Sequence, residues 1–453
     1  MIPEKYNKYF NRYYGKQWIN ARLPSKPQVW LMGPYEQSIK KDTKITRTIA
    51  CEIKAHLESD SWVWPNQTIY FFSDMHADAD AFIASLVASG GVKKTGSKDK
   101  QFKLTAEGKK ARFILGGDYF DKGPSTLRLL DVIKLLIDKG GDVVILAGNH
   151  DTRTLIGIRS LSRRHISTEH FFVRMGFKPI SLFKEIYERY LKGKKGKKYK
   201  APGIKKCRKK LFPSKNWVKK FPDIARQQVS QIALQKDMKR TIEKIDNFEQ
   251  WYTDENMSLK QIYSAVKKWK ELFLYPKGKY YWFFKHLQLA SKEGSFFFVH
   301  AGVDDLSAKM IRNHGIKKLN KQFRKKLKSE LFDLYYGPLG NMIRTKYRNC
   351  DRHFTKKGAL MMYNSGINTI VHGHRNLYYG QRIMLRKGLF NFECDTSLDI
   401  NTRKKEGIVH GPGASVTIIH PNKIILGISS DYPYIKVFEP ELTLKLCELY
   451  KER

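Results

Sequence analysis

Two aspartates, Asp118 and Asp121, stand three residues apart directly after an apolar segment of strand length. The segment, residues 112–117, ends in paired glycines, and a Lys-Gly-Pro turn follows Asp121. A buried strand that delivers carboxylates to the loop at its carboxyl end is typical of binding and catalytic sites in α/β folds. An Asp in a glycine-rich turn also commonly caps backbone amides, so this pair needs support from the rest of the chain.

That support comes from four further β-branched or aromatic runs, each of which ends in a cluster containing His, Asp or Asn. The clusters are Asp74-Met75-His76, Gly148-Asn149-His150-Asp151, His300-Ala301-Gly302 and His372-Gly373-His374. Carboxylate, imidazole and amide donors from separate strand ends suit a hard or borderline divalent ion. Because no thiolate belongs to these clusters, Mn, Fe or Zn in a reactive site is favoured over a structural zinc. Asp118, central in order, is the natural carboxylate to bridge two ions.

In their order along the chain, these clusters resemble the signature of the calcineurin-like metallophosphoesterases. The resemblance is carried by Asp74-x-His76, Gly117-Asp118-x-x-Asp121-Lys122-Gly123, Gly148-Asn149-His150-Asp151, Val299-His300-Ala301-Gly302 and Gly373-His374. Some branches of the family have a second His, in a G-H-x-H pattern. Here Arg375 and Asn376 follow His374 instead, so the sequence is closer to the phosphoprotein phosphatase branch and its bacterial members. The implied fold is an α/β protein, an αββα sandwich of two mixed sheets flanked by helices, with a helical insertion.

The resemblance implies six ligands for two divalent ions, with Mn favoured and Fe or Zn open. By position they are Asp74 and His76 for the first ion, Asp118 as the bridge, and Asn149, His300 and His374 for the second. His372 is expected to pack behind these ligands, and so is Asp395. Two bound cations lower the pKa of water enough for hydroxide to attack phosphorus at pH 7.

Two further pairs of residues receive roles from the resemblance. His150 matches the general acid that protonates the leaving group, and Asp121 matches the carboxylate that orients it. Lys122 and Arg344 are the candidates for binding phosphate. The family usually has Arg where this chain has Lys122, and a lysine is a point charge that cannot hold two oxygens in a fork.

Composition restricts the partners of the chain. Its 453 residues carry a formal net charge of +42, which favours an anionic substrate or partner, although a heavily solvated surface is the plain alternative. The five cysteines are scattered without a C-x-x-C pair, which fits a reducing compartment. With neither a signal-peptide pattern nor a membrane-spanning apolar stretch, the sequence predicts a cytoplasmic protein of unspecified oligomeric state.

Alternation of strand and helix patterns defines the expected organisation. Residues 1–66 form an N-terminal extension, 67–151 and 294–435 the catalytic core, 152–293 a helical, lysine-rich insertion that caps the cleft, and 436–453 a C-terminal tail. Within the insertion, the segment Lys192–Lys210 concentrates positive charge. It is interpreted as a solvated loop, as a contact for nucleic acid or another polyanion, or as a membrane-surface contact.

The sequence therefore predicts a metal-dependent phosphoesterase that hydrolyses phosphomonoesters of a phosphorylated anionic substrate. A protein phosphatase is the first interpretation, by the resemblance alone. A nucleotide or nucleic-acid phosphoesterase is the alternative that the positive charge favours. An inactive scaffold that binds a polyanion such as RNA is the alternative of another class.

Overall fold

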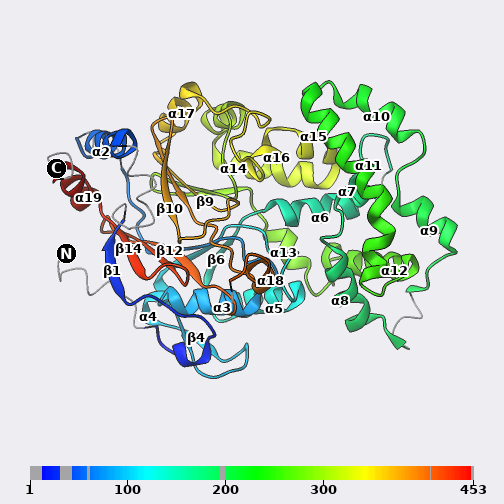
Figure 1. Ribbon diagram of the computed structural model, residues 1–453, viewed down its shortest axis with the longest axis horizontal. Coiled ribbons are helices and arrows are strands. Elements are labelled where there is room, and N and C mark those ends of the chain that lie inside the picture. Colours follow the sequence, from blue (N-terminus) through cyan, green and yellow to red (C-terminus); the bar gives the residue numbers. More distant parts are fainter. Residues whose placement is uncertain are drawn as a thin grey trace.

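Two β-sheets lie face to face with helices on their outer sides, and a helical region extends from one edge (Figure 1). The computed structural model describes residues 13–30, 43–58, 62–162, 164–193, 199–408 and 410–449. None of the helices in these residues is long and apolar enough to cross a membrane. The two mixed sheets flanked by helices confirm the fold class predicted from the sequence.

The larger sheet has seven strands, and its middle strands deliver three of the sequence clusters. Its order is β1 (Lys26–Val29), β14 (Tyr434–Phe438), β13 (Ile425–Ser429), β12 (Ser415–Ile419), β2 (Ile69–Phe72), β5 (Arg112–Leu115) and β6 (Asp142–Ile145). Strands β2, β5 and β6 are parallel to one another, with Phe71 opposite Ile114 and Ile114 opposite Val144. Their carboxyl ends therefore meet at one edge of the sheet.

The smaller sheet has five strands and delivers the remaining two clusters. Its order is β10 (Arg382–Arg386), β11 (Leu389–Glu393), β9 (Thr369–His372), β8 (Phe296–Val299) and β7 (Ala290–Glu293). Strands β8 and β9 are parallel, with Phe298 opposite Val371. His300 and His374 consequently follow the same edge of this sheet.

Alternating side chains fill the space between the sheets. In β2, Ile69 and Phe71 belong to the core between the sheets, whereas Tyr70 and Phe72 pack on the outer face against helices. Phe298 of β8 meets Phe71 with ring centroids 5.8 Å apart. These strands are buried on both faces, which explains why they are continuous apolar or aromatic runs in the sequence.

Helices cover the outer faces of both sheets. In the view of Figure 1, α3 and α5 lie below the larger sheet, and α14 and α17 lie above the smaller one. The bounds are α2 (Thr43–Glu58), α3 (Ala79–Ala88), α4 (Ala106–Lys110), α5 (Thr126–Asp138), α14 (Asp305–Ser329), α15 (Leu331–Tyr336), α16 (Pro338–Met342), α17 (Lys356–Tyr363), α18 (Ile400–Lys405) and α19 (Pro440–Leu449). The 3₁₀ helix η2 (Lys16–Trp18) and the hairpin β3 (Val92–Lys94) and β4 (Phe102–Leu104) complete this part.

The region between β6 and β7 is almost entirely helical. Its helices are α6 (Asn149–Ser160), α7 (Phe171–Arg174), α8 (Ile180–Tyr190), α9 (Ile204–Leu211), α10 (Trp217–Ala225), α11 (Gln231–Asp254), α12 (Leu259–Leu274) and α13 (Tyr281–His286). Side-chain caps fix where two of them begin: Ser230 accepts from Ala233 N, and Ser258 forms a capping box with Gln261. Helices α8, α11 and α12 lie within residues 152–293, where the sequence predicted a helical insertion.

The structure differs from the sequence expectations at three places. The sheet extends past the predicted core limits, because β14 crosses residue 435 and pairs with β1, which lies within residues 1–66. Strands β10 and β11 were not predicted. Nor was α14, whose sequence is rich in lysine and has weak apolar periodicity, with a kink at Gly315 where φ is 69°.

The smaller sheet contains a buried carboxylate that is surrounded by basic side chains. Glu393, at the end of β11, is fully buried and forms ion pairs with Arg382 and Arg386. Arg375 lies 3.7 Å away, and His372 Nε2 lies 3.9 Å away. Burial alone would raise the pKa of Glu393, but the nearby His372 and arginines lower it to about 2. His372 thus packs against Glu393, as the sequence analysis expected of a residue behind the ligands.

Replacement of this carboxylate tests how much the network stabilises the fold. Glu393→Gln should lower the free energy of unfolding by about 3 kcal/mol, because it leaves the arginines without their buried counter-charge. The difference from wild type should be complete above pH about 4.5 and should shrink as the pH falls toward 2, since the folded-state pKa lies below the unfolded one. Urea unfolding at several pH values measures the difference in free energy of unfolding between the variant and wild type. Asp138→Asn, which breaks only the exposed pair with Lys134, is the control and should cost less than about 1 kcal/mol.

Candidate active site

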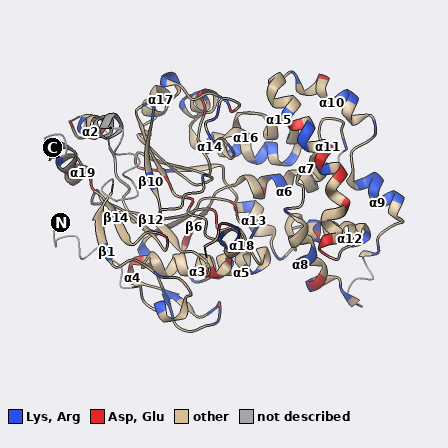
Figure 2. Cartoon of the chain, in the orientation of Figure 1, with Lys and Arg blue, Asp and Glu red and all other residues tan. Residues whose placement is uncertain are grey.

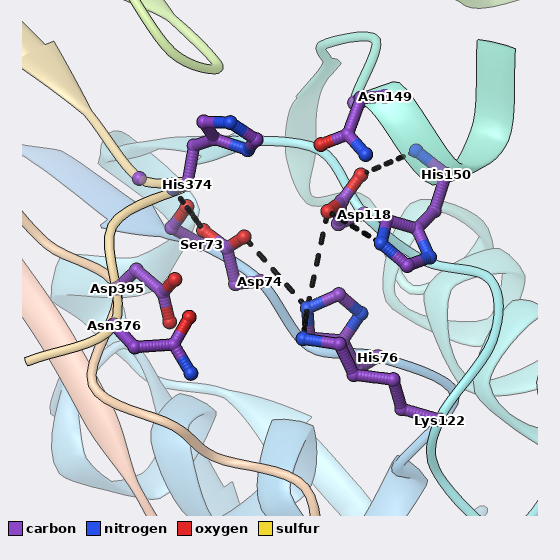
Figure 3. A network of polar contacts seen from close by, with 12 residues as sticks. Ser73, Asp74, His76, Asp118, Lys122, Asn149, His150, His374, Asn376 and Asp395 are labelled. Carbon is purple, nitrogen blue, oxygen red and sulfur yellow. Dashed lines mark hydrogen bonds and ion pairs between the residues drawn. The ribbon is translucent and has the colours of Figure 1, made fainter. Parts of the chain in front are cut away.

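The Asp118 carboxylate lies at the centre of the five sequence clusters (Figure 3). Its Oδ2 atom is 3.8 Å from Nε2 of His76, 3.8 Å from Nε2 of His150 and 3.5 Å from Nε2 of His300. Asp118 belongs to two groups of donor atoms in which all atoms lie within 4.8 Å, one with His76 and His150 and one with His300 and His374. A single carboxylate is therefore shared between two candidate ligand sets.

The first ligand set lies at the end of β2. The Asp74 Oδ1 atom is 3.9 Å from His76 Nε2, while its Oδ2 atom accepts hydrogen bonds from Ser73 Oγ and from His374 N at 2.9 Å. Burial and the neighbouring Asp118 charge raise the pKa of Asp74 to about 7. Two buried carboxylates that repel each other need a cation, and an ion placed between them would supply it.

The second ligand set joins the two sheets. His300 Nδ1 lies 2.8 Å from the Gly116 carbonyl oxygen, which can only accept, so Nδ1 carries the proton. The unprotonated Nε2 then faces the amide oxygen of Asn149 at 3.1 Å. Two acceptors at this distance are explained by a cation between them. The Nε2 atom of His374 lies 3.0 Å from the Arg344 carbonyl oxygen, so it donates there and leaves Nδ1 for the site.

The His150 and Asp121 side chains, predicted as an acid and its orienting carboxylate, are in direct contact. His150 Nδ1 lies 2.8 Å from Asp121 Oδ2, and both residues are buried. On the other side of the imidazole ring, Lys178 Nζ lies 3.1 Å from His150 Nε2. Burial, then Lys178 and Arg153, lower the pKa of His150 well below its usual value.

The backbone at these positions is unusual. Six of the predicted site residues have φ in the left-handed region: Asp74 (53°), His76 (42°), Asp118 (58°), Asp121 (68°), Lys122 (68°) and His374 (68°). Such conformations cost of order 1 kcal/mol or more for residues other than glycine. Their concentration at one edge of the sheets is typical of a site that the surrounding structure holds in place.

Glycines allow the clusters to approach one another closely. A Cβ atom added at Gly373 would lie 1.7 Å from Ser73 Oγ and 1.9 Å from Asp74 Oδ2. A Cβ atom at Gly148 would lie 2.1 Å from the Asp118 amide nitrogen and 2.2 Å from its Oδ1 atom. The glycines before His374 and Asn149 are therefore required for ligands from different strands to share one site.

Asp151 holds the Asp118 loop from behind. Its carboxylate accepts from the backbone N–H groups of Asp118 at 2.9 Å, Tyr119 at 2.8 Å, Phe120 at 3.2 Å and Gly148 at 2.9 Å. In turn, the His150 amide donates to Asp118 Oδ1 at 2.8 Å. The start of α6 and the loop after β5 are thus locked together by hydrogen bonds to two carboxylates.

The two predicted phosphate-binding residues, Lys122 and Arg344, lie on different sides of the candidate site, one at the first ligand set and one at a pocket beside Asn149. Lys122 Nζ lies 2.8 Å from His76 Nε2, so its charge faces the first ligand set. The Arg344 guanidinium lies over the Tyr335 ring, with 4.7 Å to the centroid. Arg344 lines a pocket of about 120 Å³ together with Asn149, Thr152 and Arg153.

Residues 67–254 match the model of the calcineurin-like phosphoesterase family. This part of the chain is similar to that family. The match spans the three clusters that follow β2, β5 and β6 in the larger sheet, and much of the helical region. The phosphoesterase is therefore a phosphoric ester hydrolase of metal-dependent type, as predicted from the sequence. No curated protein sequence matches the chain.

Several solved structures resemble this phosphoesterase distantly. A cold-active protein tyrosine phosphatase of a psychrophilic Shewanella species is 13% identical, with 82% of this chain and 81% of the other covered and a TM-score of 0.39. A protein serine/threonine phosphatase from Saccharomyces cerevisiae is 12% identical, with 87% and 90% covered and a TM-score of 0.34. The phosphatase domain of the Legionella effector WipB is 13% identical, with 73% and 99% covered and a TM-score of 0.30.

The donor set of the phosphoesterase fits the divalent ions that its family requires. It combines carboxylate, imidazole and amide oxygen without a thiolate, which suits Mn, Fe or Zn. Asp74 and Asp118 are buried beside Asp395, whose pKa burial and Asp74 raise well above its usual value. Lys122, whose Nζ atom lies 2.8 Å from His76 Nε2, offsets part of this negative charge, and bound cations would balance the rest.

Three side chains at the site were not singled out by the sequence analysis: Asp151, Arg153 and Lys178. Asp151 had a signal, since it follows His150 in the third cluster. Arg153 lies one turn further along α6. Lys178 lies between α7 and α8 and carries no local signal, because only the packing of the helical region brings it to His150.

Removal of the Asp151 carboxylate tests its role in positioning. Asp151→Ala would leave four buried N–H groups without their acceptor, so we expect a loss of stability of several kcal/mol. Asp151→Asn keeps one acceptor oxygen and should fold, with metal affinity reduced about 10- to 100-fold because Asp118 is displaced. Metal titration of the Asn variant measures this. Unchanged metal affinity in a folded Asn variant would contradict the role.

Proposed function

We propose that the chain hydrolyses phosphomonoesters with the help of two divalent ions, Mn most favourably. Asp74 and His76 would hold the first ion, and Asn149, His300 and His374 the second, with Asp118 shared. The observation that carries this proposal is that Asp118 Oδ2 lies 3.8 Å from Nε2 of His76 and 3.5 Å from Nε2 of His300, one imidazole from each ligand set. When bound, such ions lower the pKa of water toward neutrality and offset charge on phosphoryl oxygens.

The residues around the ligands have separate tasks in this proposal. His150 would give a proton to the departing oxygen from Nε2, because Nδ1 is held by Asp121 at 2.8 Å. Asp121 fixes the orientation of the ring and stabilises its protonated form. Arg344 and Lys122 would bind the phosphoryl oxygens. Arg344 forms no ion pair with a carboxylate of the described residues, so its guanidinium group is available for an anion.

The substrate class is a further proposal. A phosphorylated protein is the first substrate that the resemblance to the phosphoprotein phosphatase branch suggests, and a nucleotide is the alternative. An inactive binding scaffold is disfavoured, since a protein that only binds has no need for the His150–Asp121 pair beside a shared carboxylate. The cytoplasmic location stays a prediction from the cysteine content.

Hydrolysis of p-nitrophenyl phosphate with added Mn²⁺ tests the activity. Wild type should turn it over, and removal of metal by a chelator should abolish turnover until Mn²⁺ is restored. Asp118→Asn should lose nearly all activity, because both ligand sets lose their shared oxygen. His150→Asn should lower kcat by about 10²- to 10⁴-fold while metal content stays near that of wild type.

Comparing Asp118→Asn with His150→Asn distinguishes the role of a metal ligand from that of a proton donor. Should His150→Asn lose its metal together with its activity, His150 would be a ligand and not the proton donor. An inert wild type that nonetheless contains two equivalents of metal would contradict phosphomonoester hydrolysis and make RNA binding the next property to measure.

A basic helix surface supports polyanion contact as an additional proposal. On α9, Lys205, Lys206, Arg208, Lys209 and Lys210 are exposed, while Cys207 and Leu211 are buried. Figure 2 shows this concentration of Lys and Arg on α9 at the outer end of the helical region. Of the predicted segment Lys192–Lys210, residues 194–198 lie outside the described residues.

Neutralising α9 tests whether its charge serves binding. Replacing the five exposed basic residues of α9 with Ser should weaken binding to a fluorescent RNA oligonucleotide and flatten its dependence on salt concentration. Turnover of p-nitrophenyl phosphate should remain within about twofold, since α9 has no residue in the site. A loss of turnover in the folded variant would refute this separation of roles.

A further inference from the structure

Lys178 and Arg153 lie beside His150 and Asp121, and Lys244 lies near these two cations. The Lys178 Nζ atom is 3.1 Å from His150 Nε2. Arg153 lies on α6, with its Nη2 atom 3.7 Å from Asp121 Oδ2. Lys244 of α11 donates to the Arg174 carbonyl oxygen at 2.7 Å. None of these three residues is among the candidate metal ligands. We call Lys178, Arg153 and Lys244 the cationic wall.

The cationic wall contains more basic groups than the nearby carboxylates can pair with. Asp121 is the carboxylate nearest to Lys178 and Arg153, and it is already hydrogen-bonded to His150. The Arg153 Nη2 atom is buried and makes no hydrogen bond to any described residue. Lys178 forms no ion pair within 4.0 Å with a described carboxylate. The adjacent Arg174 does not add to the excess, because Asp237 pairs with it.

Burial and mutual repulsion both disfavour the charged forms of the two lysines. Burial, and after it the Arg153 charge, lower the pKa of Lys178 to about 7. Burial and the charges of Arg174, Arg153 and Lys178 lower the pKa of Lys244 to about 6. An anion that enters beside these lysines would favour their charged forms and raise their pKa values again.

The cationic wall lies where the leaving group must depart. In the proposed function, His150 Nε2 faces the oxygen that leaves, and Lys178 Nζ is 3.1 Å from that same nitrogen. A group hydrogen-bonded to Nε2 is therefore also within reach of Lys178. The scissile phosphoryl group is served by the metal ligands, Lys122 and Arg344, so Lys178 and Arg153 are left for a second negative charge.

We propose that Lys178 and Arg153 form an anion subsite for the leaving group, so that the preferred substrates are phosphoanhydrides whose terminal phosphoryl group is transferred to water. The terminal group of a nucleoside diphosphate has the same three free oxygens as a phosphomonoester. Its leaving group, however, is a phosphate, whose charge Lys178 and Arg153 would bind. A serine, threonine or tyrosine hydroxyl in a phosphoprotein offers no such charge.

The reaction is a hydrolysis and needs no co-reactant besides water. A bond forms between the water oxygen and the terminal phosphorus, and the bond from that phosphorus to the bridging oxygen breaks. The electron pair of the broken bond stays on the bridging oxygen, which becomes part of the released monophosphate. Water gives up one proton, and the products are orthophosphate and the nucleoside monophosphate. Because a phosphate oxygen is far less basic than an alkoxide, contact with cations suffices to stabilise its departure.

The test compares ADP with AMP, which share the adenosine part and differ in the charge of the leaving group. The proposed anion subsite rests on the proposed function. The kcat/KM values for ADP and for AMP are measured at a fixed concentration of free Mn²⁺. ADP is intrinsically the more reactive, so the informative quantity is the change in the ADP to AMP ratio of kcat/KM between variants. Lys178→Met should lower this ratio at least tenfold, and Lys178→Arg should restore most of it.

Two controls make the comparison specific. Lys184→Met removes a lysine of α8 that pairs with Glu255 outside the site, and the ratio should stay at the wild-type value. Arg153→Gln, made in parallel in case Lys178→Met folds poorly, should also lower the ratio. A readout without turnover is the thermal protection by α,β-methylene-ADP, which should be smaller in Lys178→Met than in wild type.

The outcomes distinguish the two proposals. An unchanged ratio and unchanged protection in both variants would overturn the anion subsite. So would a wild type that prefers a phosphoserine peptide to ADP. Failure of wild type to hydrolyse p-nitrophenyl phosphate, ADP and AMP alike would overturn the proposed function itself.

Discussion

The site depends on one buried carboxylate, that of Asp118, and on what surrounds it. A charge this deep is tolerable only where hydrogen bonds and cations offset the loss of water. One oxygen of Asp118 accepts from the His150 amide, and the other faces three imidazole nitrogens. Neutral imidazoles do not balance a carboxylate, so the arrangement makes chemical sense as a holder of positive ions.

Rigid backbone and close glycine contacts position this carboxylate. Asp118 has φ of 58°, and four N–H groups of its neighbourhood bind to Asp151. Gly148 and Gly373 bring the loops after β6 and β9 to within contact of Asp118 and Asp74. The two sheets therefore meet as one site, although residues 149 and 300 belong to different sheets and are far apart in sequence.

The candidate ligands could be proposed from the sequence because they follow buried strands directly, and parallel strands end at the same edge. The αββα fold and the helical character of residues 152–293 were predictable for a related reason: the periodicity of helices such as α12 is local. Lys178 was not predictable, because its place beside His150 depends on how α7 and α8 pack onto α6. Asp151 lay in a recognised motif, but its four hydrogen bonds are tertiary contacts that spacing does not reveal. The kinked, lysine-rich α14 was missed because its charges dilute the apolar pattern.

The pairing of β1 with β14 has a consequence for biosynthesis. Lys26 of β1 is opposite Tyr434 of β14, and β12, β13 and β14 lie between β1 and β2 in the sheet. A chain emerging from the ribosome can pair β2 with β5 and β6 early, but the half of the sheet beyond β2 is absent until residues 415–438 have been made. The edge of β2 that pairs with β12 lacks its hydrogen-bond partner during that time. Contacts across such sequence distances form slowly, so this enzyme should rely on chaperones during synthesis more than a protein whose sheet assembles in chain order.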